Sequence, residues 1–494
     1  MNYPVWEPFA ANSLIIAFVA IIHVFVSHFA IGGGLYLVLA EIRARRKNDQ
    51  EHLNYVRRHS KFFMLLTVVF GAATGVGIWI TIGLIHPVGT KWLINNFVWG
   101  WATEWVAFFV EIAAIIIYYY GWQRLSPKVH LAVGWIYFIA AWASLFVING
   151  IIGFMLTPGE WLLSGNFWDG FFNPTFWPSL FFRTFICLML AGLYATLTVA
   201  KEKNIDLKTR IMRFNGLFII VPMILLVPSG LWYYNALPAS VTAAFVAGST
   251  PMIATQIMIV AAAVLLLLSF LSNIIFPRHS GYISAGILLL LGLIAMGGFE
   301  WTREAIRKPF VIYDFLYSNN QLVTPTDYEK ATLPRVTTGN RGRDLYLTNC
   351  RSCHTLSGYK SLSDRLAGLE EEHIANIIPR LQHYFGPMPP FGGDADDAKA
   401  LASYLITIAD PDPLTGDNSQ SDENKAKIVF GRRCGGCHTL NGARPLGESF
   451  ADMDGEEIAE IIGAIEDLAD EMPPFTGSNE ELRLLTEYLK GGGK

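Results

Sequence analysis

The chain has 494 residues and a formal net charge of −4, and 52% of its residues are hydrophobic while only 16% are charged. Soluble domains have about 25% charged residues, and the deficit here falls on residues 1–300, because residues 320–494 have an ordinary polar composition. This composition excludes a fully soluble protein, and without a basic tract it indicates no nucleic-acid partner.

Eight apolar stretches in the first 300 residues are long enough for membrane-spanning helices, which need about 20 residues. We expect these helices at about residues 13–40, 62–86, 97–121, 130–155, 177–200, 214–236, 252–276 and 282–300. The first stretch is too long for a cleavable signal peptide and lacks a small-residue cleavage site, so we expect it to remain in the protein.

The loops between these stretches predict the orientation of the chain. The loops on one side hold fifteen Lys and Arg residues, whereas those on the other side hold only Lys91 before residue 300. The positive-inside rule therefore puts the N-terminus outside the cytoplasm, and eight crossings return the chain to that side. We expect a multi-pass protein of the bacterial inner (cytoplasmic) membrane, with the C-terminal part on the periplasmic side.

Ionisable side chains inside membrane spans are costly, so each is a candidate for function. They are His23 and His28 in the first span, Glu104 and Glu111 in the third, Arg183 in the fifth, and Glu300 and Glu304 at the end of the eighth. A rise of 1.5 Å per residue puts His23, Glu104, Arg183 and Glu304 in one slab near the outer face. Imidazole and carboxylates at one depth favour metal or haem ligation, and interhelical polar contacts are the alternative.

The C-terminal part contains a repeat. "NCRSCHTLSG" (349–358) and "RCGGCHTLNG" (433–442) both carry the Cys-x-x-Cys-His signature of c-type haem attachment, and in each copy a Met-Pro-Pro segment places Met 34 residues after the His. A fixed spacing of this kind indicates two copies of one folded unit. The predicted thioether residues are Cys350, Cys353, Cys434 and Cys437, and the predicted iron ligands are His354, Met388, His438 and Met472.

These modules resemble small class I cytochromes c over about residues 340–490. His and Met together fill both axial positions of the iron and raise its reduction potential, so such a unit passes electrons and binds no substrate. A zinc or redox motif is the alternative for the Cys-x-x-Cys-His segments, and a buried packing Met is the alternative for Met388 and Met472. Cys187 lies in an apolar run, where a small buried residue is expected.

The predicted fold class is therefore all-α. We expect a polytopic bundle of eight transmembrane helices in residues 1–310 and a linker over 311–340. Two small helical cytochrome c domains follow, over 341–410 and 420–494.

Several segments within residues 1–315 resemble the large subunit of cytochrome bd-type oxygen reductases. They read "HVFVSHFAIGGGLYLVLAE", "FGAATG", "WATEWVAFFVEIAAIIIYYYGWQRL", "ASLFVINGIIGFMLTP" and "EWTREAIRKPFVIY". The resemblance implies one or two high-spin haems of b or d type near the outer surface. It also implies that His23 and Glu304 are haem ligands and that Glu104 lies at the oxygen-reducing haem.

The same resemblance assigns further roles. It puts Glu111 on the proton path. It matches Arg307 to the arginine of the family's Gly-Arg-Gln-Pro-Trp-like motif, and it matches Asn149 to an Asn of the fourth helix. It also implies a second membrane subunit, and a homodimer is the alternative.

The chain departs from this family at the quinol side. Residues 237–250 leave no room for the long quinol loop after the sixth helix, and Arg183 stands where the family has the His ligand of a low-spin haem b. Met252 or Met258 would supply only half of that haem site. Arg183 suits either a haem propionate or a structural ion pair, and His28 has no counterpart in the family pattern.

From these features we predict an oxidoreductase, a bd-like terminal reductase that receives electrons from a periplasmic cytochrome c or another redox protein. Two haem c groups would pass them to high-spin haem in the membrane, where O2 or NO is reduced with the help of Glu104, Glu111 and Arg307. Two alternatives stay open. One is a quinol-linked b/c electron conduit to periplasmic acceptors without gas reduction, and the other is a non-catalytic cytochrome subunit of a larger respiratory complex.

Overall fold

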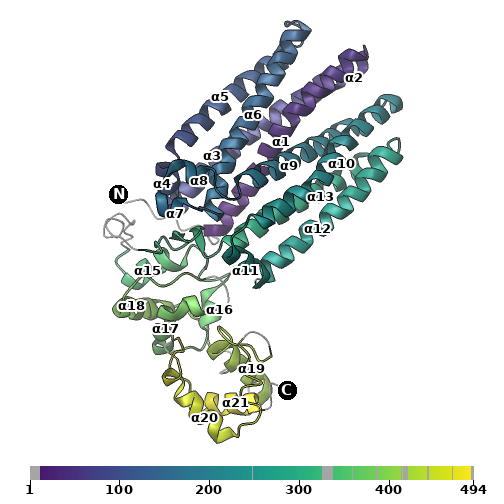
Figure 1. Ribbon diagram of the computed structural model, residues 1–494. Coiled ribbons are helices and arrows are strands. Elements are labelled where there is room, and N and C mark those ends of the chain that lie inside the picture. The colour runs from purple at the N-terminus through teal and green to yellow at the C-terminus, as the bar shows by residue number, and fades with distance from the viewer. Residues whose placement is uncertain are drawn as a thin grey trace. The chain divides into compact units, whose positions relative to one another are not determined.

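The computed structural model describes residues 12–247, 249–324, 338–358, 360–384, 388–412, 414, 421–441, 444–469 and 471–490. The chain forms two compact units, which we call the membrane unit (Ile16–Phe315) and the cytochrome unit (Leu316–Lys494 with the first residues of the chain). In Figure 1 the membrane unit runs from purple to teal, and the cytochrome unit runs from green to yellow.

Eight helical segments of 24 to 36 residues are long and apolar enough to cross a membrane, as the sequence predicted. Their elements are α1 (Asn12–Arg46), α2 (Gln50–Met64) continued by η1 (Leu65–Gly71) and α3 (Ala72–Ile85), α5 (Val98–Gly121), α6 (Pro127–Leu156), α9 (Phe176–Val199), α10 (Ile205–Asn235), α12 (Ser249–Ser269) continued by η2 (Phe270–Ile275), and α13 (Tyr282–Arg307). Large apolar side chains such as Trp99, 76% exposed, cover the outside of the bundle, where lipid would remove them from water.

Short elements fill the connections at one end of the bundle (Figure 1). They are α4 (Pro87–Asn96), α7 (Trp161–Ser164), α8 (Phe167–Phe171) and α11 (Ala239–Ala247). Two short strands, β1 (Phe310–Ile312) and β2 (Leu316–Tyr317), follow the last membrane helix. This end also receives the C-terminus of α13, which carries several of the predicted site residues.

The helices of the bundle approach one another closely where small residues lie. A Cβ atom on Gly32 would lie 1.9 Å from the backbone oxygen of Cys187, so α1 and α9 touch backbone to backbone. Small residues allow such contacts, which stabilise helix pairs in lipid. Cys187 is fully buried at this crossing, as its apolar surroundings predicted.

The cytochrome unit contains the two predicted helical domains. The first comprises α15 (Arg341–Leu345), η3 (Tyr346–Cys350), α16 (Leu362–Leu366), α17 (Glu371–Ile377), η4 (Ile378–His383) and α18 (Ala395–Ile406). The second comprises α19 (Asp422–Arg433), α20 (Gly455–Gly463), η5 (Ile465–Asp467) and α21 (Asn479–Lys490). Because α20 and α21 each begin 84 residues after α17 and α18, the sequence repeat is also a structural repeat. The all-α fold class is confirmed.

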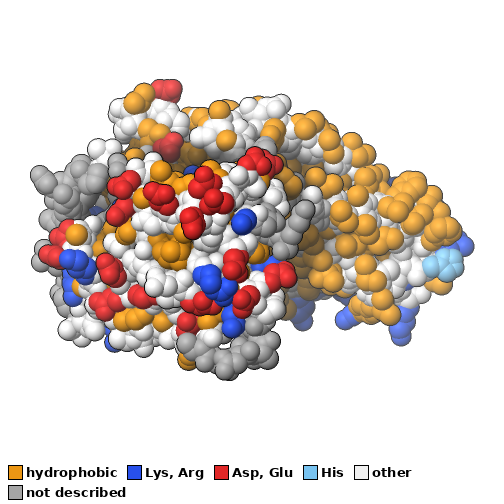
Figure 2. All heavy atoms as spheres, turned by 90° about the horizontal axis from the view of Figure 1, so that it is seen from below, with side chains coloured by type: hydrophobic (Ala, Val, Ile, Leu, Met, Phe, Trp, Pro, Cys, Tyr) orange, Lys and Arg blue, Asp and Glu red, His pale blue; other side chains and the backbone are white. Residues whose placement is uncertain are grey.

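Each cytochrome domain has its own apolar core, in which the first and last helices cross. Leu345, Ile374 and Leu401 belong to the first core, whereas Val429 and Leu485 belong to the second. The surface of this unit carries many Asp and Glu side chains, while hydrophobic side chains dominate the surface of the bundle (Figure 2).

The segment predicted as a linker, residues 311–340, begins within the membrane unit, where the Tyr313 N–H donates to the Met155 carbonyl at 3.0 Å. Residues a few positions further on pack on the first cytochrome domain. Asn319 Nδ2 donates to the Pro390 carbonyl at 2.9 Å, and Gln321 Nε2 donates to Asn349 Oδ1 at 2.9 Å. Residues 325–337, the middle of the predicted linker, lie outside the described residues.

Candidate functional site

The two Cys-x-x-Cys-His turns present their histidines in the same way. His354 Nδ1 donates to the Lys360 carbonyl at 3.0 Å, and His438 Nδ1 donates to the Arg444 carbonyl at 3.1 Å. Because a carbonyl oxygen only accepts, each Nδ1 carries the ring proton and each Nε2 keeps a lone pair for a metal. Lys360 and Arg444, each six residues after its His, also share a left-handed backbone, with φ of 50° and 47°.

The cysteines of these turns are held by a shared helical turn. The His354 N–H donates to the Cys350 carbonyl and the His438 N–H donates to the Cys434 carbonyl, each at 2.9 Å. Burial, followed by repulsion from Cys353, raises the pKa of the Cys350 thiol to about 12. All four thiols are free in the structure, so each is available for a thioether bond.

In the second domain the predicted haem residues line one cavity. Cys434, Cys437, His438 and Met472 all face it. One iron held between His and Met needs both ligands on the same cavity, and the apolar walls suit a porphyrin, so the residues fit a c-type haem. Among the described residues, no group of three or more His, Cys, Asp or Glu side chains is arranged to hold a metal ion.

In the first domain, Met388 is half-buried and follows residues 385–387, which lie outside the described residues. The placement of Met388 against His354 therefore stays a prediction.

A cavity in the membrane unit collects three of the predicted residues. His23 from α1 and Glu104 and Glu111 from α5 line the same space. Thr67, Val68 and Gly71 of η1 form another part of its wall. A π-helical stretch inside a long helix often marks a functional site, because its wider turns displace side chains from their regular positions.

His23 has the hydrogen bonding of a metal ligand. The Thr74 hydroxyl donates to the backbone oxygens of Phe70 (2.9 Å) and Gly71 (3.0 Å), so its own oxygen is left to accept. His23 Nδ1 lies 3.1 Å from that oxygen and donates to it when the hydroxyl proton points to either carbonyl. The lone pair is then on Nε2, and the Thr74 contact orients the ring.

The two glutamates lie along one face of α5. Glu104 Oε1 accepts a hydrogen bond from Ser144 Oγ at 3.1 Å, whereas Glu111, seven residues further along the helix, lines the cavity together with Tyr137. A carboxyl group near His23 and a second one two turns away are suitably placed to hold and pass protons.

Arg183 belongs to a different group of buried residues. Its Nη1 donates to Glu300 Oε1 at 2.7 Å and lies 3.4 Å from His28 Nε2. Arg303 Nε donates to the other oxygen of Glu300 at 3.0 Å. Of the two roles considered for Arg183, the geometry shows the ion pair.

Glu304 and Arg307 form a third group at the end of α13. Arg307 Nη2 donates to Glu304 Oε2 at 2.5 Å, and Arg307 Nη1 donates to the carbonyls of Phe310 and Val311. The four residues predicted to share one slab near the outer face, His23, Glu104, Arg183 and Glu304, therefore fall into three groups of side chains. The 1.5 Å rise predicts depth along a helix but says nothing about the direction of a side chain around it.

The remaining candidates have packing roles. Asn149 Nδ2 donates to the Phe176 carbonyl at 2.8 Å, and Asn149 Oδ1 accepts from Ser179 Oγ at 2.7 Å, which ties α6 to the start of α9. Met258 packs against the core of the bundle, whereas Met252 is largely exposed.

One buried cluster was missed by the sequence analysis. Glu41 of α1 accepts from Tyr118 Oη at 2.7 Å and from His130 Nδ1 at 2.9 Å, and Arg45 Nε donates to it at 2.7 Å. A Glu four residues before an Arg on one helix face was the available signal, but only the fold brings α5 and α6 to it.

Comparisons with known proteins agree with this division of the chain. Residues 13–237 match the family described as cytochrome bd terminal oxidase subunit I. Residues 337–405 and 421–489 each match the family described as cytochrome C oxidase, cbb3-type, subunit III. The membrane part of the chain is therefore similar to cytochrome bd subunit I, and its C-terminal part is similar to two copies of a cytochrome c domain. Both family assignments imply haem, and the second implies c-type haem.

One known protein is similar to part of this chain in sequence, and another is similar in structure. A protein of Bacillus subtilis (strain 168) named putative cytochrome bd menaquinol oxidase subunit I is 26% identical over 205 residues, which are 39% of this chain and 45% of that relative. The chain therefore matches less than half of the relative's length. The structure of bd oxidase from Geobacillus thermodenitrificans aligns with a TM-score of 0.56 at 16% identity, over 65% of this chain and 92% of that one. This likeness shows a shared fold.

Proposed function

We propose that this bd-type fusion is a terminal reductase of the bacterial inner membrane, in which two haem c groups supply electrons to haem in the cavity of His23. The observation that carries the proposal is the cavity itself. An imidazole with a free Nε2 lone pair and two carboxyl groups share it, in a chain that also carries two c-haem domains. O2 is the proposed acceptor, and NO is the alternative.

The residues of the cavity have distinct roles in this proposal. A haem bound there would supply the iron that accepts electrons and reduces the gas. His23 would hold that iron through Nε2, and Thr74 would orient the imidazole. Glu104 holds a proton near the reacting atoms with the help of Ser144, and Glu111 passes protons to it from deeper in the bundle. The ion pair of Arg307 with Glu304 braces the end of α13.

The proposed electron source is a periplasmic cytochrome c or another redox protein. The connection between α10, which ends at Asn235, and α12, which begins at Ser249, is short and, in its described residues, contains the helix α11. The relative from Bacillus subtilis is named a menaquinol oxidase. Electron delivery by c haem in place of quinol accounts both for the short connection and for the added domains. In this proposal the added domains lie on the periplasmic side. The partner is a second membrane subunit or a second copy of the chain.

Haem content and gas binding test this proposal on the purified full-length protein. A pyridine haemochrome spectrum should show two covalent c haems and at least one extractable haem, and CO should change the spectrum of the reduced extractable haem. Reduced cytochrome c should drive O2 or NO consumption, whereas quinol should not. A protein with c haem alone, or with an extractable haem that does not bind CO, would contradict the proposal and favour an electron conduit.

A further inference from the structure

The cavity of the second cytochrome domain has a wall made by the first domain. Besides the haem-attachment residues, it is lined by His373, His383 and Tyr384, all of which precede the second domain in the chain. The Tyr384 ring packs against Gly436, between the two haem-attachment cysteines, because a Cβ atom on Gly436 would lie 2.2 Å from Tyr384 Cε1. The second domain therefore does not enclose this cavity by itself.

His373 is the unusual member of this wall. It is only 2% exposed, and among the described residues neither of its ring nitrogens has a hydrogen-bond partner. A buried polar group without a partner is unfavourable, and a bound water, ion or ligand can satisfy it. Burial, followed by the charge of Arg433, lowers the pKa of His373 to about 4, so the imidazole is neutral and offers one N–H donor.

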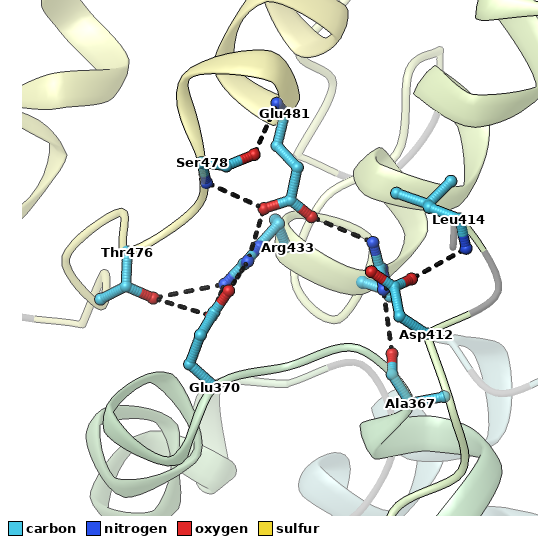
Figure 3. Close-up of polar contacts among 9 residues, drawn as sticks. Ala367, Glu370, Asp412, Leu414, Arg433, Thr476, Ser478 and Glu481 are labelled. Atoms are coloured by element: carbon cyan, nitrogen blue, oxygen red, sulfur yellow. Dashed lines mark hydrogen bonds and ion pairs between the residues drawn. The ribbon is translucent and has the colours of Figure 1, made fainter. Parts of the chain in front are cut away.

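Arg433 supplies a second unused donor beside it. Its two Nη atoms donate to Glu370 at 2.8 Å each, and also to Glu481 and Thr476 (Figure 3). The side chain is 1% exposed, and its Nε–H has no partner among the described residues. Glu370 is the N-cap residue of α17 and His373 lies one turn later, so the ion pair ties Arg433 to the helix that carries His373.

The chemistry of haem identifies what these donors would meet. The four porphyrin nitrogens bind iron, so the propionate carboxylates are the hydrogen-bond acceptors that a haem offers. A carboxylate buried near a guanidinium and an N–H donor is well stabilised, since charge-assisted hydrogen bonds are the stronger ones.

We propose that the two cytochrome domains share the second haem site, with His373 of the first domain and Arg433 of the second donating hydrogen bonds to a propionate of the haem held by Cys434, Cys437 and His438. These bonds disperse the propionate charge and so raise the potential of that haem. The inference rests on the cytochrome c assignment and is independent of the gas that the membrane unit reduces.

Substitution of His373 tests this in the full-length protein by potentiometric titration of the c-haem bands. His373→Leu should lower the midpoint potential of one c haem and leave the other unchanged, whereas His373→Gln, which keeps an N–H donor, should restore most of the loss. Glu372→Gln, an exposed neighbour on α17, is the matched control and should change neither haem. A Met388→His background, which is expected to lower the midpoint potential of the first haem, identifies the affected one.

Equal shifts of both haems, or no shift in His373→Leu with both haems attached, would overturn the proposal. If His373→Leu fails to retain the second haem, the midpoint potential of His373→Gln tests the proposal instead. A wild-type potential in that variant supports the hydrogen bond, and a loss as large as in a variant without any donor, such as His373→Phe, contradicts it. None of these outcomes depends on CO binding or gas consumption, so failure here is distinguishable from failure of the proposed reductase.

Discussion

At the scale of single residues, the hydrogen bonds of the imidazole rings separate candidate ligands from packing histidines. His23, His354 and His438 each commit Nδ1 to an acceptor and leave Nε2 free. His130 differs, because its Nδ1 contacts Glu41 and its Nε2 contacts the Tyr118 carbonyl at 2.9 Å. An imidazole can bind iron only through a nitrogen with a free lone pair. The hydrogen bonds of His130 therefore exclude it as an iron ligand, whatever its depth in the membrane.

His23 is the residue on which the membrane site depends. We expect His23→Ala to abolish the CO-induced change in the spectrum of the reduced membrane haem, because the iron loses its protein ligand. His28→Ala is the control, since His28 donates to the Val24 carbonyl and faces Arg183 instead of the cavity of His23. An unaltered CO spectrum in His23→Ala, or its loss only in His28→Ala, would reassign the ligand.

Met472 should set the potential of the second haem c. We expect Met472→His to lower the midpoint potential of one c haem, because imidazole favours ferric iron more than a thioether does. Met453→Leu serves as the control, as Met453 packs against the core of the same domain. Identical redox titrations of Met472→His and the wild type would leave Met472 as a packing residue.

At the scale of helices, the ion pair of Arg183 with Glu300 joins α9 to α13 inside the bundle. Both side chains are nearly fully buried, and Arg303 completes the group. A charged residue inside a span is tolerated when it is paired, so this group explains why α13 can carry Glu300 within its length.

Removal of Arg183 should leave the buried negative charge of Glu300 partly uncompensated. We expect Arg183→Leu to destabilise the protein by about 3 kcal/mol, because Glu300 keeps only Arg303 as a partner. The double variant Arg183→Leu/Glu300→Gln should recover most of this loss. Thermal unfolding in detergent measures both, and equal stability of the single variant and the wild type would show that the pair is not a structural brace.

At the scale of the whole molecule, the cytochrome and membrane units are separately compact, so their cofactors can be removed separately. We expect Cys350→Ala/Cys353→Ala to lose one covalent haem while the CO spectrum of the membrane haem stays intact. Gas consumption driven by reduced cytochrome c should disappear, because electrons must cross the c haems. The same rate in the variant and the wild type would show that electrons bypass the first cytochrome domain.

The sequence alone determined what is periodic or local along the chain. Eight apolar stretches predicted the eight spans, and the fixed spacing of Cys350, Cys353 and His354, repeated at Cys434, Cys437 and His438, predicted two cytochrome domains, because burial in lipid and covalent haem attachment both act on contiguous residues. Only the tertiary structure decided which side chains meet. It grouped His23 with Glu104 and Glu111, paired Arg183 with Glu300, and brought His373 to the cavity of the other domain, since these contacts depend on helix rotation and on the packing of segments far apart in the chain.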